Sequence, residues 1–183
     1  QRIDVNVNVV AVWEKVRNAG REDLHLVCSN GEQLGAHALI LCAASPVVQA
    51  MLQHSMREEL ERTIMLTDTS LAAASLFLDL LYVGATEAEV NHGTAVAALV
   101  LAHRWQCHGV VGMLECALEQ LLTDASFEEI ATAVAERRDD LLVLTSACVR
   151  YAWASKAIQR KIRRDECSPC VQEMCKPKKG ASE

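Results

Sequence analysis

An Asn-Gly dipeptide between two short apolar segments constrains this chain more than any other feature. Leu24 and Leu26 alternate with their neighbours before Asn30-Gly31, which is the two-residue period of a half-buried strand. Both turn residues tolerate a positive φ angle, so the dipeptide predicts a tight hairpin. The return strand is expected over residues 32–36.

Two short helices are expected directly after this hairpin. An apolar run over residues 38–44 follows His37 and predicts the first helix. Ser45-Pro46 then restarts the chain, because Ser caps helices well and Pro suits the first helical turn. The second helix carries Met51 and Leu52. A hairpin that feeds two short helices forms a compact supersecondary unit.

The same stretch resembles the signature of the BTB (POZ) domain. That family typically shows an Asp before its first hairpin strand, a His at the hairpin exit and an apolar run that ends in Ser; Asp23, His37 and Ser45 occupy these places. Further on, Tyr82-Val-Gly84 resembles the Tyr-x-Gly that ends a helix of the family, and residues 97–121 resemble its last helical pair. Ala38 and Val48 depart from the family pattern, which bears on partners rather than on the fold.

The resemblance implies an α+β fold. Its parts are a small, mostly three-stranded sheet flanked by helical hairpins, and a short all-α extension similar to the BACK region. The expected divisions are an N-terminal strand and helix (1–20), the BTB domain (21–122), the BACK-like extension (123–166) and a Cys- and Lys-rich tail (167–183).

The N-terminal segment predicts a strand and then a helix. Apolar residues alternate from Ile3 to Val9, the period of a strand that must pair with something. That strand is expected to be an extra or exchanged strand, or the tail of an upstream domain. A helix follows to Arg17, and its apolar side carries Val9, Val12, Trp13 and Val16. Trp13-Glu14 resembles the dimer-interface helix of the MATH-and-BTB (speckle-type POZ protein-like) adaptors; the alternative is an ordinary packing helix within one subunit.

The central and C-terminal segments predict one further strand and several helices. Ser70 and Thr94 are expected to cap two of the helices, Gly109 to break the pattern, and Ser126 and Glu129 to form a capping box. The expected elements are a strand at 63–66, a connection or edge strand at 86–90, and helices at 71–83, 94–106, 110–122 and 126–137, with one or two more over 139–162.

Bulk composition excludes several classes of protein. An apolar content of 51% is ample for a core, and a net charge of −6 argues against nucleic acid as a partner. No apolar run reaches the roughly 18 residues that span a bilayer, and no secretory leader is visible, so no membrane association is expected. Because the first residue is Gln1, we expect an upstream portion of the chain.

Eight cysteines lie in two kinds of setting. Those inside apolar segments are expected to behave as small buried hydrophobes in a reducing compartment, the cytoplasm or the nucleus: Cys28, Cys42, Cys107, Cys116 and Cys148. Cys167 and Cys170 have the spacing of half a zinc site, with Cys175 close by, but a fourth ligand is not in view. The prediction is therefore no metal and no cofactor, and a flexible basic terminus with exposed thiols.

The sequence carries no catalytic constellation. A nucleophile elbow, a Gly-rich phosphate loop and a zinc-protease motif are all missing from it. His37 and Asp23 could form a proton relay, but a His that closes a hairpin more often donates a hydrogen bond that fixes the turn. We therefore expect an interaction protein and not an enzyme.

The resemblance implies two interaction surfaces. Met56-Arg57-Glu58 matches the hydrophobic-any-Glu motif by which relatives bind the cullin-3 N-terminal domain, and Met51 and Leu52 are expected to contribute. The alternative is an exposed loop with one tolerated Met. The second surface is a two-fold homodimer interface formed by Val9, Val12, Trp13, Val16, Leu39 and Ile40.

Together these features predict a homodimeric substrate adaptor of a cullin-3 RING ubiquitin ligase. The substrate would be reached through a domain upstream of Gln1. The first alternative is a BTB scaffold for transcriptional or cytoskeletal assembly that does not bind cullin. A more remote alternative is a metal-dependent regulator that acts through the Cys tail.

Overall fold

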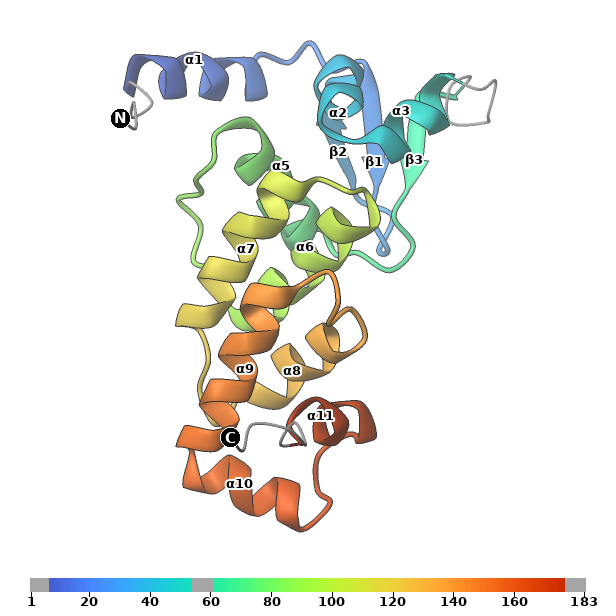
Figure 1. Ribbon diagram of the computed structural model, residues 1–183. Helices are drawn as coiled ribbons and strands as arrows, with labels where there is room; N and C mark the ends of the chain where they lie inside the picture. Colours follow the sequence, from blue (N-terminus) through green and yellow to red (C-terminus); the bar gives the residue numbers. More distant parts are fainter. Residues whose placement is uncertain (1–6, 54–60, 177–183) are drawn as a thin grey trace. The chain divides into compact units, whose positions relative to one another are not determined.

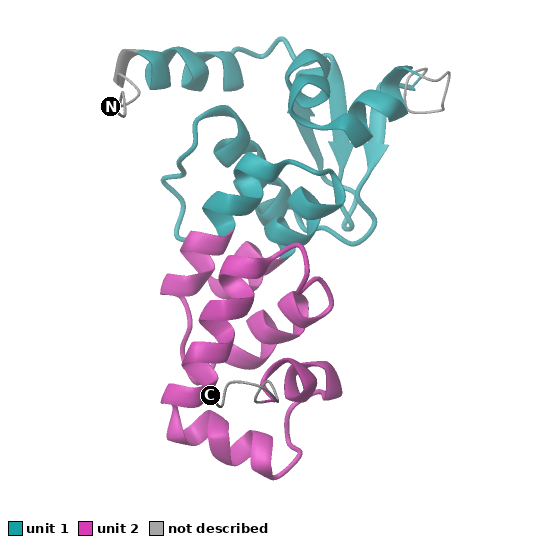
Figure 2. Ribbon diagram, in the orientation of Figure 1, with its two compact units in different colours: residues 1–90, 97–114 teal, residues 91–96, 115–183 magenta. Residues whose placement is uncertain are grey.

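The chain divides into two compact units. The computed structural model describes residues 7–53 and 61–176 (Figure 1). Unit 1 contains residues 1–90 and 97–114, and unit 2 contains residues 91–96 and 115–183 (Figure 2).

Unit 1 is built on a three-stranded mixed sheet of order β2-β1-β3. Strand β1 (Leu24–Val27) pairs antiparallel with β2 (Gln33–Ala36), and Leu24 lies opposite Ala36. On its other side, β1 pairs in parallel with β3 (Thr63–Met65). Leu24 and Leu26 are fully buried, so the apolar period predicted the buried face of β1 correctly.

The Asn-Gly turn forms the predicted hairpin. Gly31 has a φ angle of +84°, which a residue with a side chain rarely adopts. The backbone N–H of Cys28 donates to the Glu32 carbonyl at 2.8 Å and closes the turn. The Asn30 side chain accepts from the Glu32 N–H at 3.0 Å, a local contact typical of Asn in turns.

Helices pack around this sheet within unit 1. They are α1 (Val7–Arg17), α2 (Ala38–Ala44), α3 (Pro46–Gln53) and α5 (Leu71–Tyr82). Two more helices, α6 (His92–Arg104) and α7 (His108–Gln120), have residues in both units. In the core, Phe77 meets Trp105 edge to face, with ring centroids 5.4 Å apart. The prediction of a small three-stranded sheet with helices is confirmed.

Unit 2 is all helical. It contains α8 (Phe127–Ala135), α9 (Leu142–Ala154), α10 (Lys156–Arg163) and α11 (Pro169–Met174). Helix α9 packs against α8 and α10, and α11 packs against α8. The Phe127 and Tyr151 rings stack with centroids 5.9 Å apart. The predicted segment 139–162 is therefore two helices, and a further helix follows it.

Several predictions about element ends were wrong. Residues 7–9 are helical rather than extended, because α1 begins at Val7; residues 3–6 lie outside the described part of the chain. Residues 86–90 form a connection, the first of the two predicted alternatives, and not an edge strand. Gly109 lies inside the first turn of α7 and does not break it. A short period-two pattern does not exclude a helix when helix-compatible residues continue it.

Two predicted caps were also wrong. Helix α6 begins at His92, and the Asn91 side chain, not Thr94, caps it by accepting from the Thr94 N–H at 2.8 Å. The Ser126 hydroxyl donates back to the Leu121 carbonyl at 2.7 Å and does not cap α8. The Ser70 cap is confirmed, since its hydroxyl accepts from the Ala73 N–H.

All eight cysteines lie in the described residues and are free thiols. Cys28, Cys107 and Cys148 are buried as predicted, but Cys116 is exposed and Cys42 half-buried. The prediction of exposed tail thiols was wrong: Cys167 and Cys175 are buried and Cys170 is half-buried, because α11 packs this segment onto α8. Within residues 7–53 and 61–176, no group of three or more His, Cys, Asp or Glu is placed to hold a metal ion. In the same residues no helix combines the length and apolar character required to cross a bilayer.

Candidate protein-interaction surfaces

Three signature residues fix the exit of the hairpin. The Asp23 carboxylate accepts from the Ala38 N–H at 2.7 Å and so caps α2 from outside that helix. The Tyr82 hydroxyl accepts from the His37 backbone N–H at 2.9 Å and lies 2.9 Å from its Nδ1. Burial raises the pKa of Tyr82, which keeps its hydroxyl protonated near neutral pH. Asp23 contacts Ala38 and His37 contacts Tyr82, so both side chains have structural partners and these contacts do not support a proton relay.

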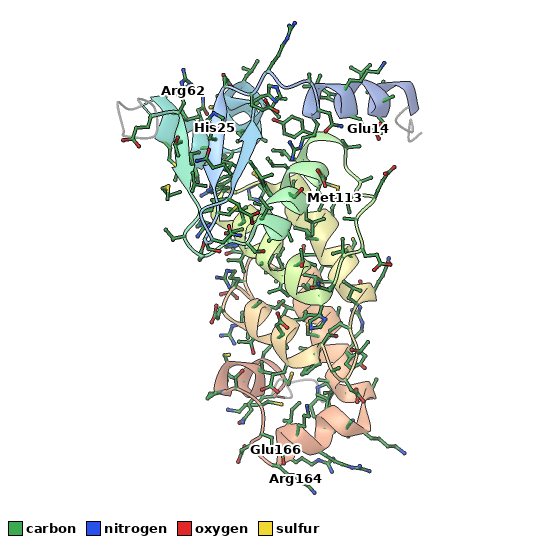
Figure 3. All side chains as sticks on the ribbon, turned by 180° about the vertical axis from the view of Figure 1, so that it is seen from behind. Glu14, His25, Arg62, Met113, Arg164 and Glu166 are labelled. Atoms are coloured by element: carbon green, nitrogen blue, oxygen red, sulfur yellow. The ribbon has the colours of Figure 1, made fainter. Side chains whose placement is uncertain are left out.

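Ser45 and Gly84 complete the signature. Ser45 is fully buried; its hydroxyl donates to the Trp105 carbonyl at 2.6 Å and accepts from the Val48 N–H at 3.0 Å. It therefore caps α3 and ties this helix to the end of α6. Gly84 has a φ angle of +76° directly after α5, and Met113, labelled in Figure 3, is the nearest side chain to that position.

Arg17 anchors α1, a role that was not predicted from the sequence. Its guanidinium donates to the Gly35 carbonyl at 3.4 Å, lies 3.7 Å from the Asp79 carboxylate and covers the Tyr82 ring at 5.8 Å. Burial raises the pKa of Asp79 and Arg17 opposes that shift. The sequence offered one signal for this role. Arg17 is a cation in the last turn of an expected helix, where a positive charge interacts favourably with the helix dipole.

The predicted dimer residues differ in exposure. Leu39 is 81% exposed and Val12 is 57% exposed, and Val9 and Trp13 are exposed as well. Val16 and Ile40 are half-buried. Exposure leaves these side chains available to a partner, and the dimer interface stays a prediction.

The predicted cullin-binding residues lie in and beside the segment after α3. Met56 and Glu58 fall outside the described residues. Met51 is half-buried near the end of α3, whereas Leu52 is buried with only 7% exposure and belongs to the core. After this segment the chain returns to the sheet at Arg62, whose carbonyl accepts from the His25 N–H at 2.9 Å; Figure 3 labels both residues.

Comparison with known proteins identifies the family. The sequence model of the BTB/POZ domain matches residues 15–122. The BTB and MATH domain-containing protein 40 of Caenorhabditis elegans is 30% identical over 122 residues, which cover 66% of this chain and 30% of that protein. The TD and POZ domain-containing protein 2 of Mus musculus is 28% identical over 88 residues, 48% of this chain and 24% of that protein.

Two further similarities are more limited. The transcription factor Ken of Drosophila melanogaster is 36% identical over 64 residues, which cover 35% of this chain and 11% of Ken. The structure of the BTB domain of human gigaxonin aligns with a TM-score of 0.46 and 19% identity, over 62% of this chain and 93% of that domain. This chain thus spans less than a third of the length of each of the three relatives.

The BTB/POZ match covers more than half of the 183 residues, in one order and with its signature residues in contact. This chain therefore belongs to the BTB/POZ family, whose domain is a non-catalytic protein-interaction module.

Proposed function

We propose that this protein is a homodimeric substrate adaptor of a cullin-3 RING ubiquitin ligase. The observation that carries the proposal is the position of Met56-Arg57-Glu58, directly after α3 of a BTB domain. Residues 21–122 would be the docking module, and the BACK-like helices from residue 123 to 166 would extend its cullin surface.

The chemistry of the three-residue motif suits a groove on a partner. A Met side chain is flexible and polarisable, so it fills a shallow apolar pocket well. Glu58 adds a charge-assisted hydrogen bond at the rim. Met51, half-buried near the end of α3, is the neighbour that adds apolar area. Leu52 does not contribute to this surface because it is buried in unit 1.

Self-association is the second part of the proposal. Val12 on α1 and Leu39 on α2 are exposed apolar side chains that a symmetric partner would cover. Arg17 holds α1 onto α5 and β2, so the helix is anchored before a partner arrives. Dimerisation would double the number of substrate-binding domains for each ligase.

The adaptor role is geometric. It holds a substrate near the ligase, which raises the effective concentration of the substrate lysines without chemistry by the adaptor. A relative named for a BTB and a MATH domain supports a reader domain upstream of Gln1, which would bind the substrate. Such a role places the protein in the cytoplasm or the nucleus.

Binding to the purified cullin-3 N-terminal domain tests the proposal. We expect Met56→Asp and Glu58→Lys each to weaken binding by about tenfold or more in calorimetry. Matched controls are Met65→Asp, at a methionine that is 62% exposed on β3, and Glu89→Lys, at an exposed glutamate; both should bind like the unmodified chain. Equal binding by all four variants would show that Met56 and Glu58 do not mediate cullin binding.

A second candidate is a BTB scaffold for transcriptional assembly that does not bind cullin. The observation that favours it is the similarity to Ken, a protein named as a transcription factor. A chain that is dimeric in solution and gives no calorimetric signal with the cullin-3 domain would select this candidate.

A further inference from the structure

One face of α9 leaves large apolar side chains in solvent. Leu142 is 65% exposed and Trp153 is 51% exposed, with half-buried Val149 between them. Their spacing of seven and four residues places all three on one side of the helix, opposite the side that buries Leu144 and Cys148. They line a groove of about 950 Å³ bordered by α9 and residues 173–176 of the same unit.

Positive charge is concentrated beside this apolar face. Residues 150–164 contain six basic residues and no acidic residue, in a chain whose net charge is −6. On α10, Lys156, Arg160 and Arg163 are exposed at positions i, i+4 and i+7, while Ile158 is buried on the other side. One helical stripe of α10 is therefore cationic along its whole length.

Trp153 lies where the apolar and the basic regions meet. It lines the large groove together with Arg150, and it lines a small pocket of about 50 Å³ together with Ile162 and Arg163. The α10 residue Gln159 donates to the Trp153 carbonyl, which fixes the end of α9 against α10. An exposed aromatic ring that lines two pockets, each with an arginine in its lining, is a typical anchor point of a binding surface.

We propose that this α9–α10 surface binds an acidic amphipathic helix of a partner protein. The stripe from Leu142 to Trp153 is roughly 16 Å long, which equals three helical turns of a ligand. Apolar side chains on one face of that ligand would cover Leu142, Val149 and Trp153. Its carboxylates would face Arg150 and Arg163.

The acidic residues of the groove favour a peptide over a nucleic acid. Asp139 and Glu173 line the groove, and Glu119 forms an ion pair with Arg150 at 2.7 Å. A continuous phosphate backbone would meet these carboxylates, whereas a peptide places its charges singly. The α9–α10 surface lies within the helices that the proposed function assigns to an extended cullin surface, but it uses no residue of Met56-Arg57-Glu58. The peptide test can therefore fail while cullin binding through that motif stands.

Fluorescence anisotropy with the full chain tests this inference. The probe is a labelled helical peptide of about five turns, with Leu on one face and Glu on the other. Comparison probes are a scrambled peptide of the same composition, the same peptide with Lys in place of each Glu, and an oligothymidylate. We expect that only the acidic amphipathic peptide binds and that added salt weakens its binding.

Variants locate the binding site. Trp153→Ala and Arg163→Glu should each lower the affinity for the peptide by about tenfold or more. Met65→Ala, at an exposed methionine of unit 1, and Arg21→Glu, at an exposed arginine of unit 1, should leave the affinity for the peptide unchanged. Arg163 is exposed, so its variant remains informative if Trp153→Ala fails to fold.

Four outcomes would overturn the inference. The first is no binding of the acidic peptide, and the second is equal binding of the scrambled or Lys-containing peptide. The third is full affinity in both Trp153→Ala and Arg163→Glu. The fourth is displacement of the peptide by the oligothymidylate, which would identify the surface as a nucleic-acid site.

Discussion

Ser45 shows how much one small polar side chain contributes to this fold. Its hydroxyl is fully buried and serves both as a donor to Trp105 and as an acceptor from Val48. The same atom thus starts α3 and joins residues 60 positions apart in the chain. A buried carbonyl and a helix-terminal N–H both depend on it.

Ser45→Ala should lower the free energy of unfolding by about 2 kcal/mol, the sum of a lost cap and a buried carbonyl left without its donor. Urea unfolding followed by circular dichroism measures this change. Ser146→Ala is the matched control, because the Ser146 hydroxyl donates to Leu142 on an exposed face. Equal midpoints for the two variants would contradict the structural role of Ser45.

At the scale of one element, α9 begins without a cap of its own. Its N-cap residue is Leu141, whose side chain cannot accept a hydrogen bond. Instead, the Glu115 carboxylate of α7 accepts from the Leu144 N–H at 3.0 Å. Glu115 is buried, so a negative charge near the positive end of the α9 dipole acts in a partly dry environment.

Glu115→Ala should therefore destabilise unit 2 by about 1–3 kcal/mol. Glu119→Ala, one turn further along α7, removes an exposed ion pair with Arg150 and should cost less than about 1 kcal/mol. Thermal unfolding of the two variants measures the difference. A Glu119 variant as unstable as the Glu115 variant would show that the cap is not the source of the effect.

The elements also show how far the sequence alone could lead. Turn chemistry at Asn30-Gly31 and the signature from Asp23 to Ser45 were local signals, so the hairpin, α2 and α3 were predicted well. The sequence did not show which of several nearby hydrogen-bond partners a capping side chain would choose. The Asn91 cap and the Ser126 bond to Leu121 each replaced an equally plausible local pattern.

The candidate surfaces were predictable to a similar extent. The helical period suggested Val12 and Leu39 as interface residues. Only three-dimensional packing shows that both are exposed and that Leu52 is buried. Arg17 meets Asp79 across 62 positions of sequence, a pairing that no spacing rule indicates. The apolar stripe of α9 was hidden because α9 is apolar on both faces.

At the scale of the whole molecule, the exposed apolar residues of α1 and α2 predict a dimer. Val12→Asp and Leu39→Asp should each shift the chain toward monomer, because a buried unpaired carboxylate is costly at an interface. Sedimentation velocity measures the shift as a rise of about tenfold or more in the dissociation constant. Leu142→Asp, at an exposed apolar residue of unit 2, is the control that should remain dimeric. A monomeric unmodified chain would contradict this part of the proposal.

Stability should fall at alkaline pH. Burial raises the pKa of Cys107 and Cys175 from 9.0 to about 11, and that of Cys148 from 9.0 to about 12. The folded state holds these protons more tightly than the unfolded state, so their stabilisation is complete below pH 9 and is lost as the pH rises above it. Each thiol contributes a slope of up to ~1.4 kcal/mol per pH unit in urea unfolding. A flat profile from pH 8 to pH 11 would contradict this prediction.

The accessibility of the eight thiols has a practical consequence for all of these experiments. Cys116 is the exposed cysteine, while burial raises the pKa of Cys42 and slows its reaction. In a Cys170→Ser variant, which removes the half-buried thiol of α11, a brief treatment with a maleimide dye should therefore attach one fluorophore per chain on α7. Counting photobleaching steps would then report directly how many copies each complex contains.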